Sequence, residues 1–260
     1  MTTIKKLTLS VLLGVSSLLA GTIAGGEVSL GYYSHTPSGT ASYSPFGTIN
    51  PEVDLEEDFG WSTKQDLFLK ASIEHPVPML PNIRLGYTDF SNAGTGTVTD
   101  FSWGDIRLFS GEIDTALDMQ YFDIALYYEL LDNWLSFDAG LTMRYIDGDI
   151  AVDTRANIGP VTTLPLSEST DFSLWLPMLY GKARFDVPNT DISMQLEGNF
   201  ITYQDTTLYD FEISVRYTFG MGLGIEGGFK GLSLDSTDLT DGLTVDADTG
   251  GPFAAVVWDF

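Results

Sequence analysis

Apolar and polar residues alternate along most of the chain from residue 26 onwards. In WLSFDAGLTMRYIDG (134–148), every second residue from Leu135 to Tyr145 is apolar, and the residues between them are small, polar or charged. LYDFEISVRYTFG (208–220) repeats this pattern from Tyr209 to Phe219. Because successive side chains of a strand point to opposite faces, a period of two predicts β-strands with one apolar and one polar face.

The alternation defines ten segments, and no amphipathic helix of convincing length appears. The predicted strands are 27–34, 64–75, 82–90, 116–131, 134–147, 172–187, 190–203, 206–220, 221–235 and 250–260. Short connections rich in turn residues lie at 76–82, 130–134, 187–190 and 218–222, and longer ones at 35–63, 91–115, 148–171 and 236–249, with 203–207 as a brief exception. An even number of strands with short turns at one end and long loops at the other is the layout of an outer-membrane barrel.

A soluble β-sandwich also alternates, so the position of the charged residues has to separate the two folds. The central positions of the apolar faces carry no Lys, Arg, Asp or Glu, whereas the opposite faces carry most of the basic residues. The charge network predicted for the lumen comprises Lys70, Arg84, Arg144, Lys182, Arg184, Arg216, Lys230, Asp138, Glu197, Asp210, Glu212 and Glu226. The inward aromatic residues are predicted to be Phe68, Tyr127, Tyr180 and Tyr203. A basic side chain turned to lipid costs about 2–4 kcal/mol at the bilayer midplane, so the apolar faces are predicted to contact lipid.

Aromatic residues lie at both ends of the apolar faces, as they do at the two interfaces of a membrane. The predicted aromatic girdle includes Tyr128, Trp134, Tyr145, Tyr217 and Phe219. The last segment, AAVVWDF, places Val256, Trp258 and Phe260 on the apolar face. Lipid leaves no partner for unpaired backbone groups, so the last strand is expected to pair with the first. The predicted fold is all-β: an antiparallel up-and-down transmembrane β-barrel of about ten strands.

The composition is strongly acidic and lacks cysteine. There are 36 Asp+Glu against 12 Lys+Arg, which gives a net charge of −24. This argues against a nucleic-acid partner, because little in the chain could neutralise a phosphate backbone. The absence of cysteine excludes disulfides and thiolate chemistry.

Residues 1–24 combine Lys5 and Lys6 with an apolar run and small residues, which predicts a cleaved signal peptide. Residues 25–260 are then the barrel, with long acidic extracellular loops and short periplasmic turns.

At this point the chain resembles the small outer-membrane β-barrels of Gram-negative bacteria. YFDIALYYELLDNWLSFDAGLTMRYIDGDI and TGGPFAAVVWDF are similar to a family of outer-membrane barrels named for a Gly-Gly pair. The resemblance implies a location in the bacterial outer membrane with both termini periplasmic. It also implies contact with outer-membrane lipid and lipopolysaccharide, and biogenesis through the secretion translocon and the barrel-assembly machinery. That machinery would read the pattern of Val256, Trp258 and Phe260. A monomer is expected.

Residues suited to catalysis are few, and no cofactor is expected. The chain has two histidines, His35 and His75. His75 lies at the short-turn end of the predicted strand 64–75, and its position in the alternation places it on the outward face. His35 follows Ser34, and adjacent residues of a strand point to opposite faces, so the two are poorly placed to form a nucleophile–base pair. No Asp-x-His unit of a paired-aspartate protease is present. A lipid-modifying hydrolase or acyltransferase that uses His35 is kept as an alternative to a non-enzymatic role.

One short stretch of the sequence bears on metal binding. DADTGG (246–251) begins like a calcium loop, with Asp246 and Asp248 as candidate ligands, but the twelfth position of such a loop is Val257, inside a predicted strand. No metal site is therefore predicted.

Pro177 interrupts a predicted strand and is expected at a bulge or at the outer rim. A ten-stranded lumen is little wider than side chains can fill, so we predict a filled polar lumen with a structural or interaction role, or narrow passage of small solutes. A small-solute channel is the other alternative.

Overall fold

The computed structural model describes residues 25–45, 49–77, 79–155, 166–240 and 242–260, so the predicted signal peptide lies outside the described residues. Ten long strands follow one another in space in chain order, and a short strand, β2 (Val53–Asp54), and a 3-10 turn, η2 (Gly220–Gly222), accompany them. The long strands are β1 (Gly25–Tyr43), β3 (Lys64–Glu74), β4 (Asn82–Trp103), β5 (Ile106–Asp132), β6 (Leu135–Arg155), β7 (Ser167–Asp186), β8 (Ile192–Tyr203), β9 (Thr206–Thr218), β10 (Leu223–Thr240) and β11 (Leu243–Asp259). No helix among the described residues is long and apolar enough to cross a membrane.

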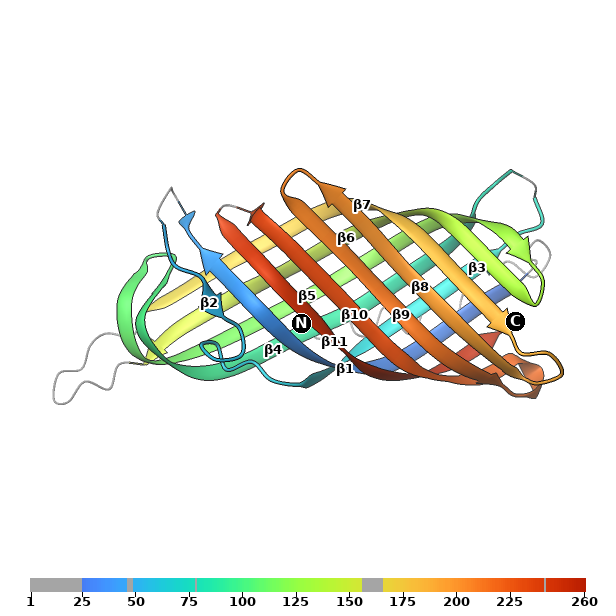
Figure 1. Cartoon of the computed structure of the whole chain (residues 1–260), viewed down its shortest axis with the longest axis horizontal. Helices are drawn as coiled ribbons and strands as arrows, with labels where there is room; N and C mark the ends of the chain where they lie inside the picture. Colours follow the sequence, from blue (N-terminus) through green and yellow to red (C-terminus); the bar gives the residue numbers. More distant parts are fainter. Residues whose placement is uncertain (1–24, 46–48, 78, 156–165, 241) are drawn as a thin grey trace, which may run out of the picture.

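The sheet closes on itself, because β11 pairs antiparallel with β1 from Glu27 opposite Asp259 to Tyr43 opposite Leu243. Every other neighbouring pair of long strands is also antiparallel. Figure 1 shows the strands tilted around a long cylinder. The prediction of an all-β, antiparallel barrel of ten strands is therefore confirmed.

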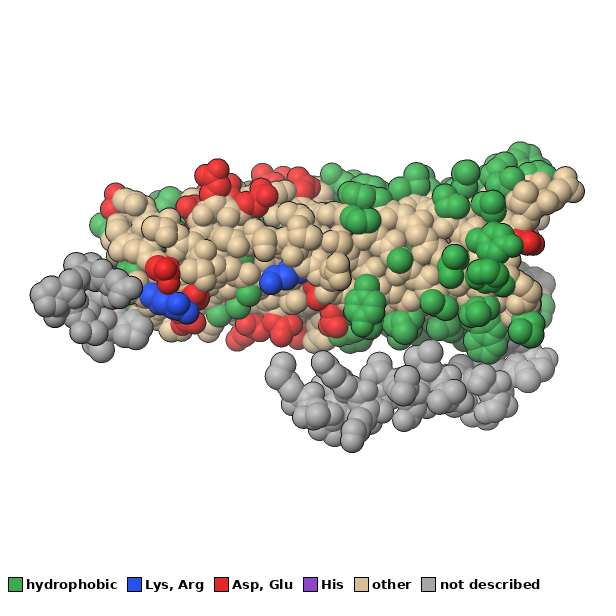
Figure 2. All heavy atoms as spheres, turned by 90° about the horizontal axis from the view of Figure 1, so that it is seen from below, with side chains coloured by type: hydrophobic (Ala, Val, Ile, Leu, Met, Phe, Trp, Pro, Cys, Tyr) green, Lys and Arg blue, Asp and Glu red, His purple; other side chains and the backbone are tan. Residues whose placement is uncertain are grey.

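One end of the barrel carries a continuous outward-facing band of exposed apolar side chains, which we call the apolar belt. Its central residues are Leu30, Ile83, Leu85, Phe122, Ile124, Leu126, Leu141, Met143, Leu179, Met194, Leu196, Phe211, Ile213, Val215, Ile225 and Val256. Figure 2 shows hydrophobic side chains gathered over this end of the molecule and acidic side chains over the other. A water-soluble protein rarely leaves so large a contiguous apolar surface uncovered, and the hydrocarbon of a bilayer would cover it.

The strands extend much further beyond the belt than the sequence predicts. β5 contains 27 residues, whereas a tilted strand needs about 9–11 to cross a bilayer. Most residues of the predicted loops 91–115, 148–171 and 236–249 continue as strand, and β4 and β5 are joined by a turn of two residues at 104–105. The expectation of long loops is therefore wrong for 91–115 and 236–249, whereas residues 156–165 of the connection 148–171 lie outside the described residues. We call the part of the barrel beyond the belt the distal half.

In the remaining long connection, residues 49–63 fold inward where β1 and β4 are not adjacent. β2 pairs with β1, and the Asn50 side-chain amide donates to the backbone oxygens of Tyr43 and Gly104 at 2.7 and 3.1 Å. The segment buries Val53, Leu55, Phe59 and Trp61 inside the barrel. Trp61 Nε1 donates to Thr115 Oγ1 at 2.9 Å, and this hydroxyl donates to the Phe59 oxygen at 2.9 Å. We call residues 49–63 the filling segment.

Two glycines of β4 let the filling segment lie close to the barrel wall. A Cβ at Gly94 would lie 2.3 Å from the Phe59 oxygen, and one at Gly96 would lie 1.7 Å from the Asp58 oxygen. Any larger residue at either position would push the segment away from β4. The distal half is thus filled like a soluble core, with Phe59, Phe101 and Trp103 in edge-to-face contact. Together, the closed sheet, the apolar belt and the filled interior have the architecture of an outer-membrane β-barrel.

Candidate functional site

The interior at the level of the belt is polar and is organised around Arg144 of β6. Arg144 is 1 % exposed, and its guanidinium binds Asp123 of β5 through two hydrogen bonds of 2.7 and 2.8 Å. Its Nη1 lies 2.7 Å from Asp210 Oδ2 of β9. The ring of Tyr121 lies 4.4 Å below the guanidinium carbon. The planar fork of arginine suits this double carboxylate contact, which a lysine could not reproduce.

A second cluster lies on the neighbouring part of the wall. Glu212 accepts from Lys70 at 2.6 Å and lies 3.4 Å from the Lys230 ammonium group. Glu197 accepts from Arg84 at 2.5 Å and lies 3.8 Å from Lys70. These five residues come from β3, β4, β8, β9 and β10, so the cluster joins strands on several sides of the barrel. Its charges are held in place by one another, because each carboxylate contacts two cations.

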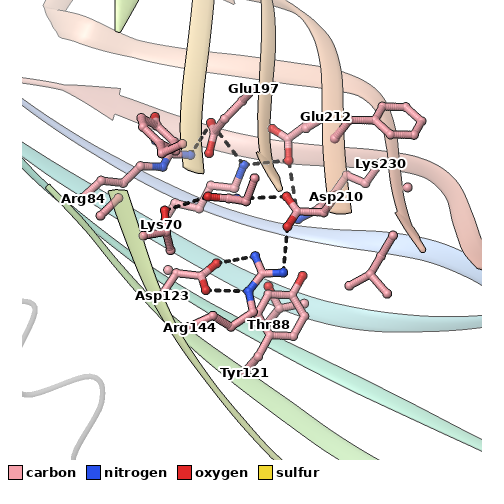
Figure 3. Close-up of a pocket in the computed structure, with 18 of the residues that line it drawn as sticks. Lys70, Arg84, Thr88, Tyr121, Asp123, Arg144, Glu197, Asp210, Glu212 and Lys230 are labelled. Carbon is pink, nitrogen blue, oxygen red and sulfur yellow. Dashed lines mark hydrogen bonds and ion pairs between the residues drawn. The ribbon is translucent and has the colours of Figure 1, made fainter. Parts of the chain in front are cut away.

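The two clusters neutralise each other and leave little space between them (Figure 3). Their cations are Lys70, Arg84, Arg144 and Lys230, and their carboxylates are Asp123, Glu197, Asp210 and Glu212. The cavity that they line measures about 50 Å³. A buried water needs roughly 10–15 Å³ of such volume, so the cavity would hold three or four waters and no larger solute.

A third cluster closes the interior near the short turns. Arg216 of β9 donates to Glu226 from Nε at 3.0 Å and from Nη2 at 2.8 Å. Its Nη1 donates to Glu27 at 2.8 Å and to Asp259 at 3.2 Å, which links β9 and β10 to the strands that close the barrel. Ten of the twelve residues of the predicted lumen network thus take part in ion pairs among the described residues.

The other two members of the predicted network behave differently. Lys182 faces the interior but lies within 4 Å of no carboxylate among the described residues. Asp138 is buried and likewise makes no direct ion pair in the described part of the chain. Arg184 pairs with Asp186 at 2.8 Å, next to the short turns. Sequence parity places a side chain inside the barrel, but it does not determine which partner the side chain reaches.

The predicted inward aromatic residues are correct at three of four positions. Phe68, Tyr127 and Tyr180 are buried in the interior. Tyr203 is 67 % exposed, so its predicted place in the filled lumen is wrong. It is the last residue of β8, beside the β8–β9 turn. The alternation of apolar and polar positions predicts which face of β8 carries Tyr203, but it does not predict how far along the barrel the interior is packed.

The residues predicted for the aromatic girdle and for assembly all lie on the outer surface. Tyr128, Trp134, Tyr217 and Phe219 are exposed, and Tyr145 is half-buried against the ring of Trp175 at 4.7 Å. Val256, Trp258 and Phe260 alternate with the buried residues Ala255 and Val257. Whether the assembly machinery reads these three residues stays a prediction.

His35 lies inside the barrel at the boundary between the polar and apolar layers. It is fully buried, and Nε2 lies 2.8 Å from Asp66 Oδ2. Asp66 also accepts from the Ser91 backbone nitrogen at 2.8 Å and from Ser91 Oγ at 3.1 Å. The imidazole packs between the rings of Tyr33 and Phe90 at 4.9 and 4.3 Å. His75, in contrast, fixes the 75–81 turn, with Nε2 3.0 Å from the Pro81 oxygen.

The candidate calcium ligands do not form a loop. Asp246 and Asp248 lie in β11, opposite Thr40 and Ser38 of β1, in extended backbone with both side chains on the outer face. No group of three or more acidic or histidine side chains in the described ranges could hold a metal ion. The likeness of DADTGG to the start of a calcium loop is therefore not matched by a loop in the structure, because the flanking glycines continue the strand.

The outer surface of the distal half carries a row of aspartates, of which Asp149 and Asp171 lie in the predicted loop 148–171 and Asp118 in the predicted strand 116–131. Asp149 of β6 lies directly opposite Asp118 of β5 on one side and Asp171 of β7 on the other. Partial burial raises the pKa of Asp149, and the negative charges of Asp118, Asp171 and Asp147 raise it further. Like charges directly opposite each other in a sheet are destabilising, so this row has no evident role in holding the fold.

Comparisons with known proteins add little beyond the fold. No family model and no curated protein matches, so the resemblance to the Gly-Gly family stays a prediction. The outer-membrane protease OmpT of Escherichia coli is similar at 13% identity and a TM-score of 0.48, over 92% of this chain and 97% of that one. The transport unit of the E. coli autotransporter AIDA-I is similar at 10% identity and a TM-score of 0.39, over 98% and 95%. Ail of Yersinia pestis is similar at 10% identity and a TM-score of 0.34, over 90% and 99%. None of these likenesses bears on the activity of this chain.

Proposed function

We propose that this chain is an integral protein of the bacterial outer membrane that works as a closed anchor and presents its distal half outside the cell. Its apolar belt would contact the lipid and lipopolysaccharide of that membrane. The short turns, Gly26 and Phe260 would lie in the periplasm, as is general for such barrels. On this view the role is structural or interactive, and the protein is not a diffusion channel.

The observation that carries this proposal is the two-layered interior. At the level of the belt, the clusters around Arg144 and Glu212 cross the lumen and leave about 50 Å³. Beyond them, the filling segment places Phe59 and Trp61 in the distal half, and Phe59 is 0 % exposed. A hydrated ion would have to break buried ion pairs and then cross an apolar core, and each step opposes passage.

Planar-bilayer recording tests this proposal. The protein is inserted into bilayers, and insertion is verified on the same preparation by heat-modifiable gel mobility. We expect no ohmic single-channel conductance above the bilayer background. A variant without residues 50–62, joined by a short Gly-Ser turn and carrying Lys70→Ala and Arg84→Ala, should conduct if it inserts. Large ohmic steps from the unmodified protein would overturn the proposal and favour the small-solute channel.

The geometry favours the hydrolase alternative less. Ser34 lies on the outer face, while His35 is buried with Asp66, so no described serine hydroxyl lies next to a solvent-accessible imidazole. A lipid substrate would have to enter the packed interior to reach Nε2. Release of labelled acyl chains from lipopolysaccharide or phospholipid vesicles, lost in His35→Ala, would restore this alternative.

A further inference from the structure

The wall of the distal half has two places where a strand lacks its usual neighbour. One lies between β1 and β4, above the start of β3 at Lys64, and there the filling segment pairs with β1 through β2 and packs its apolar side chains inside the barrel. The other lies beside β7. The pairing of β7 with β8 ends at Leu179 opposite Phe200, whereas its pairing with β6 continues to Ser167 opposite Asp153.

Among the described residues, residues 167–178 of β7 therefore pair with a strand on one side only. In Figure 1, the β8–β9 hairpin ends near the middle of the long axis, while β7 runs on toward the distal end. β10 is the next strand beyond the hairpin, and no backbone pairing joins it to β7 among the described residues. Among the described residues, the result is an edge of twelve residues with no strand paired to it, most of it beyond the belt.

The hydrogen-bond pattern shows which residues of β7 point their backbone groups to the open side. Thr154 donates to the Leu166 oxygen at 2.8 Å, so even-numbered residues face β6. Val187 donates to the Ile192 oxygen at 2.9 Å, so odd-numbered residues face β8. The register with β6 contains no bulge, so this parity holds along the strand. The amides of residues 169, 171, 173 and 175 consequently point to the open side.

The same parity explains Pro177, and it corrects the expectation of a bulge or a place at the rim. Pro177 is the first odd-numbered residue beyond Leu179, where the pairing with β8 stops, and it lies opposite Met143 of β6 in regular register. Its missing amide hydrogen belongs to the side that has no partner, so the proline costs no ladder bond. It also prevents β8 from continuing the pairing.

The two faces beside this edge differ in chemistry. On the inside, Leu174 and Leu176 of β7 and Leu232 and Leu234 of β10 pack against the apolar core but are only partly buried. On the outside lies the row of Asp118, Asp149 and Asp171, with Asp171 on the edge strand itself. An added strand would therefore meet apolar side chains on one face and carboxylates on the other.

We propose that the free edge of β7 between Ser167 and Pro177 binds an extended segment of another polypeptide by β-strand addition. The segment alternates apolar residues, which cover the partly buried leucines, with basic residues, which lie over the aspartate row. In the gap between β1 and β4, β2 of the filling segment pairs with β1, with Asp54 opposite Thr40 and Val53 opposite Ala41, and the apolar side chains of the segment are buried inside the barrel. Backbone pairing supplies the binding, and the alternating side chains supply the choice of partner.

This inference rests on the distal half lying outside the cell, as proposed above, but its test is separate. Conductance measures whether the lumen is closed, whereas peptide binding measures the edge. A conducting barrel could still bind a strand, and a closed barrel could fail to do so. Each proposal can therefore fail alone.

Binding of labelled nine-residue peptides to the purified, folded full chain tests the inference. One peptide alternates Lys and Val, and its matched counterpart alternates Glu and Val. Fluorescence anisotropy is measured for both at the same ionic strength. We expect saturable binding of the lysine peptide only. Equal binding of the glutamate peptide would overturn the role of the aspartate row.

Two sets of variants separate strand addition from general attraction to an acidic protein. Ser169→Pro with Ser173→Pro removes two amides of the free edge and leaves the bonds to β6, and Ser169→Ala with Ser173→Ala is the matched control. Asp149→Asn with Asp171→Asn removes two charges beside the edge, and Asp246→Asn with Asp248→Asn removes two from β11. Folding of every variant is verified by heat-modifiable gel mobility.

We expect the proline pair and the Asp149/Asp171 pair each to weaken binding of the lysine peptide about tenfold or more, since each removes two contacts. The alanine pair and the Asp246/Asp248 pair should each change it less than about threefold. If the folded proline variant binds as tightly as the alanine variant, the peptide is held by charge alone and strand addition is refuted. If any variant does not fold, amide hydrogen exchange of residues 167–178 is measured on the unmodified chain with and without the lysine peptide. We expect the peptide to slow exchange of these amides. Unchanged exchange in the presence of bound peptide would refute strand addition.

Discussion

The backbones of Gly26 and Phe260 exchange two hydrogen bonds. The amide of Gly26 donates to the Phe260 oxygen at 2.9 Å, and that of Phe260 donates to the Gly26 oxygen at 2.8 Å. The ring of Phe260 lies over the glycine, where a Cβ would come within 2.6 Å of Cζ. The final aromatic residue thus closes the barrel beside its first strand.

Deleting Phe260 should therefore destabilise the barrel by about 1–3 kcal/mol, because both backbone groups of Gly26 lose their partners at the edge of the belt. Phe260→Leu keeps the backbone and should cost less. Urea unfolding of the lipid-inserted protein measures both changes. Equal stability of the deletion and the unmodified chain would show that β1 and β11 do not depend on this last pair.

Arg144→Met should destabilise the barrel by about 3 kcal/mol, because it removes the buried cation that Asp123 and Asp210, both partly buried, share. Combining it with Asp123→Asn and Asp210→Asn should recover much of the loss. Arg155→Met is a matched control, since this arginine is exposed on the distal half, and it should change stability by less than about 1 kcal/mol. A loss in the control as large as that in Arg144→Met would contradict the lumen assignment.

Gly96→Ala should displace the filling segment, because the added Cβ would fall 1.7 Å from the Asp58 oxygen. Residues 49–63 should become accessible to proteases in the inserted protein. Gly181→Ala, where a Cβ meets nothing within 4 Å, serves as the control and should resist cleavage like the unmodified chain. Resistance in both variants would mean that the segment does not depend on its contact with β4.

The aspartate row predicts a dependence of stability on pH. The pKa of Asp149 is raised on folding by partial burial and by Asp118, Asp171 and Asp147, so the folded state binds its proton more tightly than the unfolded state does. Stability from this group is present at low pH and is lost as the pH rises through the raised pKa. Asp149→Asn should therefore stabilise the protein at pH 7 by about 0.5 kcal/mol, and the gain should disappear in acid.

The control for this prediction is Asp248→Asn, because Asp248 lies opposite Ser38 and Ser233 and so faces no directly opposed carboxylate. Urea midpoints across the acidic range compare the two variants. A gain for Asp149→Asn that stayed constant down to acid pH would show that repulsion within the row is not its cause.

The period of two was sufficient to predict the barrel, its closure and the side of each strand that faces inward. It placed Arg144 and Arg216 inside and Ile213 outside, because one face must meet lipid. Three features lay beyond it. The strands of the distal half contain many Asp, Thr and Gly residues. Because both faces of these strands are partly polar, the apolar–polar alternation is weak there, and the sequence predicts loops instead of strands. The filling segment does carry a signal, since Val53, Leu55, Phe59 and Trp61 interrupt an acidic stretch. The partners of individual charges depend on side-chain reach across strands, which parity does not describe.

The proposed function requires that one face of each strand contacts lipid and that the other lines a filled lumen. Because the chain has no cysteine, single cysteines carrying a spin label can be placed along β9, from Phe211 to Tyr217. Accessibility to oxygen, which partitions into lipid, and to a water-soluble nickel chelate is then measured in bilayers. We expect high oxygen accessibility at 211, 213, 215 and 217 and low accessibility to both reagents at 212, 214 and 216. Accessibility of 211, 213 and 215 to the nickel chelate, or no alternation at all, would contradict this requirement.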